Sequence, residues 1–149
     1  MEIAIWMKHP VHVVKPLDSI QHAREIMEEH RINQLPVVAN GRLLGIVSDR
    51  DLRDAFPSVF DSPAFGGPKH KHGADPSKIL VESVMSARLF TLGPKETVVA
   101  AAQLMRRERI GAVPILDAGR LAGILTRSDV LDAFVALVES KGSTERRTT

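Results

Sequence analysis

The feature that most constrains this 149-residue sequence is an internal duplication. A shift of 78 positions places Met7 on Met85, and the register then continues without a gap through both copies. Further coinciding residues are Pro16 and Pro94, Ala23 and Ala101, Met27 and Met105, Arg31-Ile32 and Arg109-Ile110, Pro36 and Pro114, Gly41-Arg42-Leu43 and Gly119-Arg120-Leu121, Gly45-Ile46 and Gly123-Ile124, and Asp51 and Asp129. Because chance does not produce such a register, one supersecondary unit is used twice, and each copy buries the apolar face of the other.

Each copy predicts the same series of elements. A short strand (residues 11–14 and 89–92) precedes a helix that begins after Ser19 or Thr97, whose hydroxyls suit the N-cap position. Helical spacing of apolar residues from Ile20 and Val98 onward predicts one buried stripe per helix. A hairpin follows, with strands at 35–39 and 43–47 or at 113–116 and 121–125, and Asn40-Gly41 is a strong hairpin-turn signal.

A second helix closes each copy. It begins near Arg50 or Ser128 and ends near Phe56 or in the Val138 region. The predicted fold class is therefore α+β, with two β-α-β-β-α repeats packed as a pseudo-twofold pair, each a small sheet with two helices. The predicted organisation is repeat 1 at 1–56, a Pro- and Gly-rich linker at 57–77, repeat 2 at 78–138 and a disordered polar tail at 139–149.

Composition excludes several classes of function. The formal net charge is +2 and aromatic residues make up only 4% of the chain, which argues against a nucleic-acid binder with stacking aromatics. The absence of Cys excludes disulfides and thiolate metal sites. No apolar run approaches the roughly 18 residues of a membrane span, and no basic signal region opens the chain, so we expect a cytoplasmic protein. His70 and His72 form His-x-His between flanking lysines, a weak metal signal that we interpret as a solvated basic loop, so no metal site is predicted.

These motifs together resemble the CBS domain family in its tandem arrangement, the Bateman module. The resemblance rests on Arg-Ile-Asn-Gln-Leu-Pro-Val-Val with Gly-Ile-Val-Ser-Asp-Arg-Asp-Leu in the first copy, from Arg31 and Gly45. The second copy carries Arg-Ile-Gly-Ala-Val-Pro-Ile-Leu with Gly-Ile-Leu-Thr-Arg-Ser-Asp-Val, from Arg109 and Gly123. With nothing else attached, the chain is similar to stand-alone CBS proteins of the acetoin-utilisation type. The resemblance implies clefts between the two repeats that hold an adenine nucleotide or S-adenosylmethionine, and a flat homodimer.

The candidate site residues follow the duplication. Asp51 and Asp129 lie just inside a helix start, where a carboxylate can accept hydrogen bonds from adjacent ribose hydroxyls; the alternative is a favourable interaction with the helix dipole alone. The candidates for contacts to a phosphate or a hydroxyl are Ser48, Arg50, Thr126 and Ser128. By resemblance, the base pocket comprises Val11, His12, Ile32, Pro36, Leu89, Phe90, Ile110 and Pro114, with plain core packing as the alternative.

One departure from the family narrows the expected ligand. In family members that bind several phosphates, the loop before the second strand often carries basic residues. The matching positions here are uncharged: Asn33, Gln34, Gly111 and Ala112. A monophosphate, a nucleoside-like ligand or S-adenosylmethionine is favoured, unless Lys8, His9 or Arg88 supplies charge.

The function predicted is therefore a ligand-sensing regulatory module, not an enzyme, which requires no cofactor and acts on an unknown downstream protein. A dimerisation scaffold with empty clefts is the alternative. The cleft around Thr126 and Asp129 is the better candidate for an adenosine-type ligand.

Overall fold

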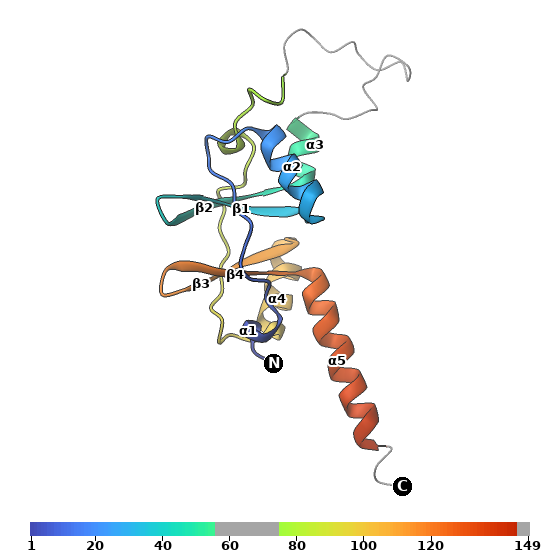
Figure 1. The fold of residues 1–149 in the computed structure, drawn as a ribbon. Coiled ribbons are helices and arrows are strands. Elements are labelled where there is room, and N and C mark those ends of the chain that lie inside the picture. The colour runs from blue at the N-terminus through green and yellow to red at the C-terminus, as the bar shows by residue number, and fades with distance from the viewer. Residues whose placement is uncertain (56–74, 146–149) are drawn as a thin grey trace, which may run out of the picture. The chain divides into compact units, whose positions relative to one another are not determined.

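The computed structural model describes residues 1–55 and 75–145. Its elements are α1 (Ile3–Trp6), α2 (Ile20–His30), β1 (Gln34–Ala39), β2 (Arg42–Ser48), α3 (Asp49–Ala55), the 3-10 turn η3 (Val81–Ser83), α4 (Val98–Glu108), β3 (Ala112–Asp117), β4 (Arg120–Thr126) and α5 (Arg127–Glu145) (Figure 1). The chain groups into two compact units, one of His12–Leu89 and one of Met1–Val11 with Phe90–Thr149. No helix within the described residues has the length and apolar character needed to cross a membrane.

The unit His12–Leu89 is built on the antiparallel hairpin of β1 and β2, with α2 and α3 packed on it. The hairpin turns at Asn40 and Gly41, whose φ angles of 51° and 74° are the two positive values that a type I′ turn requires. This confirms the turn predicted from the Asn-Gly pair. The buried core of this unit comprises Val14, Ile20, Ala23, Met27, Leu35, Val37, Val47, Leu52 and Val81.

The other unit repeats this plan around β3 and β4, with α4, α5 and the short α1. Its hairpin turns at Ala118 and Gly119 with φ angles of 49° and 78°, so the aligned Ala-Gly pair produces the same turn geometry as Asn40-Gly41. The buried core comprises Ile3, Val98, Ala101, Leu104, Met105, Val113, Ile115, Leu125 and Ala133. Two small two-stranded sheets with their helices confirm the predicted α+β class.

Both predicted helix N-caps are confirmed. The Ser19 hydroxyl accepts a hydrogen bond from the His22 N–H at 3.1 Å, and the Thr97 hydroxyl accepts one from the Ala100 N–H at 3.1 Å. Each bond satisfies a backbone donor that the first helical turn leaves without a partner. The helices α2 and α4 therefore begin where the sequence predicts.

The predicted strands at 11–14 and 89–92 are wrong as strands. Each segment forms a single parallel bridge, Val14 with Val37 and Leu92 with Ile115. To extend each ladder back through the predicted strand, the N–H of residue 36 or 114 would have to donate to the carbonyl of residue 12 or 90, but these donors are Pro36 and Pro114. Proline has no N–H, so the ladder stops after one bridge.

The last helix is longer than the sequence predicts. We expected α5 to end near Val138 and a disordered tail from 139, but the helix continues through Glu145. The hydroxyls of Ser140 and Ser143 donate to the helix carbonyls of Leu137 and Glu139, so these polar side chains bond within the helix. Residues 56–74, which include Phe56, His70, His72 and most of the predicted linker, lie outside the described residues, as do residues 146–149.

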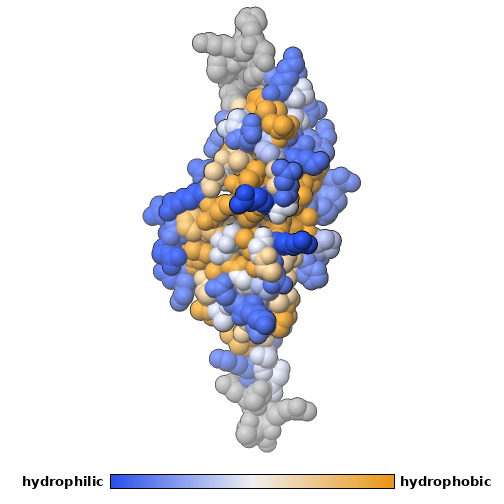
Figure 2. Space-filling model, turned by 90° about the vertical axis from the view of Figure 1, so that its left-hand side faces the viewer, coloured by the Kyte–Doolittle hydropathy of each residue, from blue (hydrophilic) through white to orange (hydrophobic). Residues whose placement is uncertain are grey.

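Apolar side chains also reach the surface. Figure 2 shows apolar surface interspersed with charged surface on one face of the molecule. The exposed apolar side chains on α4 and α5 include Val99, Leu131, Phe134, Val135 and Val138, each at least half exposed. On α5, the spacing from Leu131 to Val138 places four of these residues on one side of the helix, while Ala133 on the same helix is buried.

In each unit an extended segment crosses the second strand of the hairpin at a glycine. In one unit Lys8 forms an antiparallel bridge with Ile124 of β4, through hydrogen bonds of 2.9 and 3.1 Å. In the other, Ser86 forms the equivalent bridge with Ile46 of β2, through bonds of 3.0 and 2.8 Å. Both bridges lie beside a glycine, Gly123 or Gly45. Residues 1–11 thus lead into the first sequence repeat but pack in the unit that contains the second.

The two glycines leave the space that the crossing segments occupy. A Cβ at Gly45 would lie 2.5 Å from the Ser86 carbonyl oxygen and 2.9 Å from the Met85 sulfur. A Cβ at Gly123 would lie 2.5 Å from the Met7 sulfur and 3.1 Å from the Lys8 carbonyl oxygen. The two 2.5 Å approaches are closer than a real Cβ shows, so a side chain at either position would displace its neighbour: a backbone oxygen at Gly45 and a flexible methionine side chain at Gly123.

We expect Gly45→Ala to lower the free energy of unfolding by about 1–3 kcal/mol, because its new methyl group meets a backbone oxygen that cannot move freely. Gly123→Ala should cost less, since the nearest atoms belong to the flexible Met7 side chain. Gly142→Ala is the matched control: its Cβ meets nothing within 4 Å in α5, so it should gain roughly 0.5–1 kcal/mol. Urea unfolding measures all three, and an unaffected Gly45→Ala variant would contradict the account of the crossing.

Candidate functional site

In the unit His12–Leu89, the candidate site is the junction where β2 passes into α3. The Ser48 N–H donates to Oδ2 of Asp51 at 2.8 Å, and the Asp51 N–H donates back to the Ser48 hydroxyl at 3.1 Å. This reciprocal pair is a capping box with aspartate at the third helical position. It fixes the carboxylate at the helix start, where the helix dipole favours negative charge. Asp51 is half-buried.

The junction of β4 with α5 has the same arrangement with one more bond. Oδ2 of Asp129 accepts from the Thr126 N–H at 2.7 Å and from the Thr126 hydroxyl at 2.8 Å. The Asp129 N–H donates to the same hydroxyl at 3.4 Å. Asp129 is the one buried charged or polar residue among those described, at 4% exposure. Its carboxylate is therefore more tightly held than that of Asp51.

A lysine reaches the second carboxylate. The ammonium of Lys8 lies 3.3 Å from Oδ1 of Asp129, and the Lys8 side chain is 57% exposed where that of Asp129 is 5% exposed. The backbone bridge of Lys8 to Ile124, two residues before Thr126, holds the lysine beside the junction. The sequence predicts Lys8 only as a possible source of charge at the ligand site, and it predicts neither the crossing nor the ion pair.

The helix-to-hairpin loops are tied to the same junctions. The Asp49 N–H donates to the Asn33 carbonyl at 2.8 Å, and the Arg127 N–H donates to the Gly111 carbonyl at 3.1 Å. The predicted pocket residues Ile32 and Ile110 directly precede these two carbonyl-bearing residues and are half-buried. In each unit the structure thus brings the loop and the capping-box carboxylate together.

The remaining predicted base-pocket residues differ in burial. Pro36 and Pro114 are fully buried, which favours the packing alternative for their side chains. Val11 and Phe90 are half-buried, whereas His12 and Leu89 are exposed. The predicted site residues divide between the two units. The unit of the second repeat contains Val11, Phe90, Ile110, Pro114, Thr126, Ser128 and Asp129, and the unit His12–Leu89 contains His12, Ile32, Pro36, Ser48, Arg50, Asp51 and Leu89.

Two residues predicted to contact a phosphate or a hydroxyl are exposed at the helix starts. Arg50 has an 84% exposed side chain and forms a long ion pair of 3.9 Å with Asp54, four residues further along α3. Such an exposed pair contributes little to stability. Ser128 is also exposed. Both side chains remain accessible to a ligand.

Two imidazoles form a contact that the sequence does not predict. The rings of His12 and His30 stack with centroids 3.7 Å apart and an angle of 16° between their planes. His30 is the last residue of α2, so the stack places the His12 ring at the end of that helix. Two histidines far apart in an unaligned sequence give no signal of such a contact.

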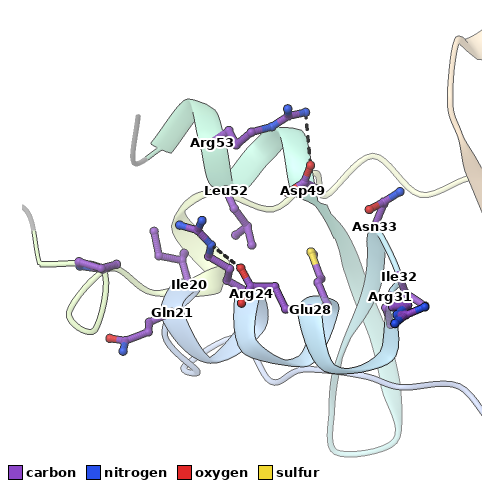
Figure 3. A pocket seen from close by; sticks show the side chains of 12 residues that line it. Ile20, Gln21, Arg24, Glu28, Arg31, Ile32, Asn33, Asp49, Leu52 and Arg53 are labelled. Atoms are coloured by element: carbon purple, nitrogen blue, oxygen red, sulfur yellow. Dashed lines mark hydrogen bonds and ion pairs between the residues drawn. The ribbon is translucent and has the colours of Figure 1, made fainter. Parts of the chain in front are cut away.

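A groove of about 950 Å³ lies between α2 and α3 (Figure 3). Apolar side chains, including those of Met27 and Leu52, line it together with charged ones. Each wall carries one ion pair within its helix: Arg24 with Glu28 at 3.1 Å on α2, and Arg53 with Asp49 at 3.3 Å on α3. Among the predicted site residues only Ile32 lines it, so this groove is not the predicted ligand site.

The CBS domain family model matches residues 2–58 and 81–136, which is most of the chain. The chain belongs to the CBS domain family. A CBS domain-containing protein of Dictyostelium discoideum is 39% identical over 123 residues, covering 78% of this chain and 79% of that protein. The tandem CBS domains recognised in the duplication are thereby confirmed.

Solved structures of CBS domain pairs share the fold. A Vibrio cholerae protein named for acetoin utilisation, AcuB, superposes with a TM-score of 0.75 at 26% identity and covers 96% of both chains. The CBS domain pair of protein MJ0100, solved with 5′-methylthioadenosine and S-adenosyl-L-methionine, superposes with a TM-score of 0.74 at 26% identity, covering 91% of this chain and 97% of that one. CBS pairs of this fold therefore include one that binds adenosine-containing molecules.

We expect removal of the capping hydroxyls to cost unequal amounts of stability. Thr126→Val should lower the free energy of unfolding by about 1–2 kcal/mol, because it removes both a donor to a buried carboxylate and the acceptor of the Asp129 N–H. Ser48→Ala should cost roughly 0.5–1 kcal/mol, since Asp51 is less buried. Urea unfolding of both variants tests the order, and a larger loss in Ser48→Ala would contradict it.

Proposed function

We propose that this chain is a regulatory module whose CBS domains bind an adenosine-containing small molecule: an adenine nucleotide or S-adenosylmethionine. The proposal assigns the ribose to Asp51 and Asp129, and contacts to phosphate or hydroxyl groups to Ser48, Arg50, Thr126 and Ser128. The role is regulatory rather than catalytic. We also propose that the module acts in the cytoplasm and regulates a protein partner that the sequence does not identify.

The observation that carries this proposal is the capping-box carboxylate, which occurs at the same position in both repeats. A carboxylate accepts hydrogen bonds but donates none, so a pair of adjacent hydroxyls suits it. Oδ2 of Asp51 and of Asp129 accepts from the N–H of the residue three positions earlier, Ser48 or Thr126, which leaves Oδ1 as the oxygen that faces a ligand. The complex of the MJ0100 pair with adenosine derivatives supports the choice of ligand class.

The uncharged positions just before and at the start of each hairpin support a ligand with few phosphates. Asn33, Gln34, Gly111 and Ala112 begin or precede the hairpins without supplying a cation. A triphosphate would require several cations to balance its charge. The proposal therefore favours a monophosphate, a nucleoside-like ligand or S-adenosylmethionine over ATP.

We expect AMP or S-adenosylmethionine, at a concentration 100 times its Kd, to stabilise the protein by about 2.7 kcal/mol through mass action. Thermal unfolding with AMP, ADP, ATP and S-adenosylmethionine measures this effect. The shift should fall in Asp51→Ala and in Asp129→Ala and be lost when both changes are combined. Absence of any shift at millimolar ligand would favour the alternative of a scaffold with empty sites, and a shift that survives both changes would exclude these carboxylates.

We further propose that the chain forms a homodimer through α5. Leu131, Phe134, Val135 and Val138 are 63, 61, 50 and 52% exposed. A contiguous apolar surface of this kind marks a protein interface in a water-soluble domain. The spacing of the four residues reads the same in both directions along the helix. A twofold axis that passes between two antiparallel copies of α5 would therefore place Leu131 opposite Val138 of the second copy and Phe134 opposite its Val135, a self-complementary contact.

Phe134→Glu should convert the dimer to a monomer, because it buries a charge in an apolar contact. Leu17→Glu is the matched control, since Leu17 is 69% exposed and lies outside this surface. Sedimentation velocity at micromolar concentration distinguishes the two states. A monomeric wild-type chain, or equal dissociation of the control variant, would overturn the proposal.

A further inference from the structure

The ion pair between Lys8 and Asp129 makes the two repeats chemically different. The Lys8 ammonium lies 3.3 Å from Oδ1 of a carboxylate whose side chain is 5% exposed, while the Lys8 side chain is 57% exposed. The lysine therefore lies on the solvent side of the pair. A ligand that approaches this carboxylate from water meets the ammonium as well.

The hydrogen bonds of Asp129 determine which oxygen a ligand can use. Oδ2 already accepts two bonds from Thr126, from its N–H and from its hydroxyl. Each carboxylate oxygen has about two acceptor positions, so Oδ2 is filled and Oδ1 retains one position beside Lys8. A hydroxyl bound to Oδ1 would share that oxygen with the ammonium. Any charged group attached to the same ligand would then lie in the field of the lysine.

The first repeat lacks this cation at the matching position. Ser86 forms the backbone bridge to Ile46 that Lys8 forms to Ile124, so the two residues occupy equivalent places in their units. The side chain of Ser86 is uncharged and cannot form an ion pair with Asp51. Among the described residues, the duplication has thus preserved the crossing but has placed an ammonium beside one of the two equivalent carboxylates, that of Asp129.

We propose that Lys8 is a specificity-determining residue: at the Asp129 site it selects adenosine-type ligands that carry a negative charge over neutral or cationic ones. The inference rests on the proposed function, because it requires a ligand at Asp129. A 5′-phosphate gains a favourable interaction with the ammonium, whereas neutral adenosine gains none and the sulfonium of S-adenosylmethionine is repelled. The Asp51 site, with Ser86 in place of the lysine, does not make this distinction.

Calorimetric titration of the full chain in an Asp51→Ala background isolates the Asp129 site. The probes are AMP, adenosine and S-adenosylmethionine. We expect AMP to bind more tightly than adenosine, and Lys8→Met to reduce the ratio of their affinities roughly fivefold to tenfold, as one partly screened charge pair would. Lys8→Arg should keep the ratio, because it keeps the charge.

The reciprocal experiment transfers the lysine to the other repeat. In an Asp129→Ala background, Ser86→Lys should raise the preference of the Asp51 site for AMP over adenosine by a similar factor. An unchanged ratio in Lys8→Met would overturn the inference while leaving the proposed function intact. If the wild-type chain binds none of the three probes, both the proposed function and this inference are wrong. Circular dichroism of each variant verifies that its fold is retained.

Discussion

The structure depends on a steric constraint that occurs twice, where an extended segment crosses the second strand of a hairpin over a glycine. At Gly45 the nearest atom of the crossing segment is a backbone oxygen, and at Gly123 it is a methionine sulfur, each 2.5 Å from the position of a Cβ. The missing side chain lets the two backbones bond to each other. This contact decides which part of the chain joins which unit, because each crossing segment comes from the sequence before the other repeat.

The same crossing determines the chemistry near the carboxylates. Lys8 reaches Asp129 because the residue before it, Met7, lies against Gly123, and the bridge to Ile124 then fixes the lysine near the start of α5. The capping boxes themselves are local, since each bond joins residues three positions apart in sequence. The local bonds are therefore nearly the same in both repeats, and the long-range contact makes the repeats differ.

Sequence reasoning succeeds here where the determinants are local. The caps at Ser19 and Thr97, the positive φ angles at Asn40-Gly41 and the periodic core of α2 all depend on residues within one turn or one helix. It fails where a distant residue decides. The strands expected at 11–14 and 89–92 are single bridges, because the donors that would extend them are Pro36 and Pro114, and finding those donors requires knowing the partner strand. Neither the stacking of His12 on His30 nor the position of Lys8 has a sequence signal of its own, since both depend on tertiary contacts.

The exchange of leading segments also bears on how such a chain arose. The segment that precedes each repeat packs in the unit of the other repeat. A chain with a single repeat would therefore lack a segment to cross the glycine of its own hairpin. Two identical single-repeat chains could complete each other by trading these segments, in the manner of a domain-swapped pair. Gene duplication followed by fusion would join them covalently and make the trade intramolecular. From then on the two leading segments could diverge separately, and Lys8 and Ser86 are different residues at the equivalent positions of the two crossings.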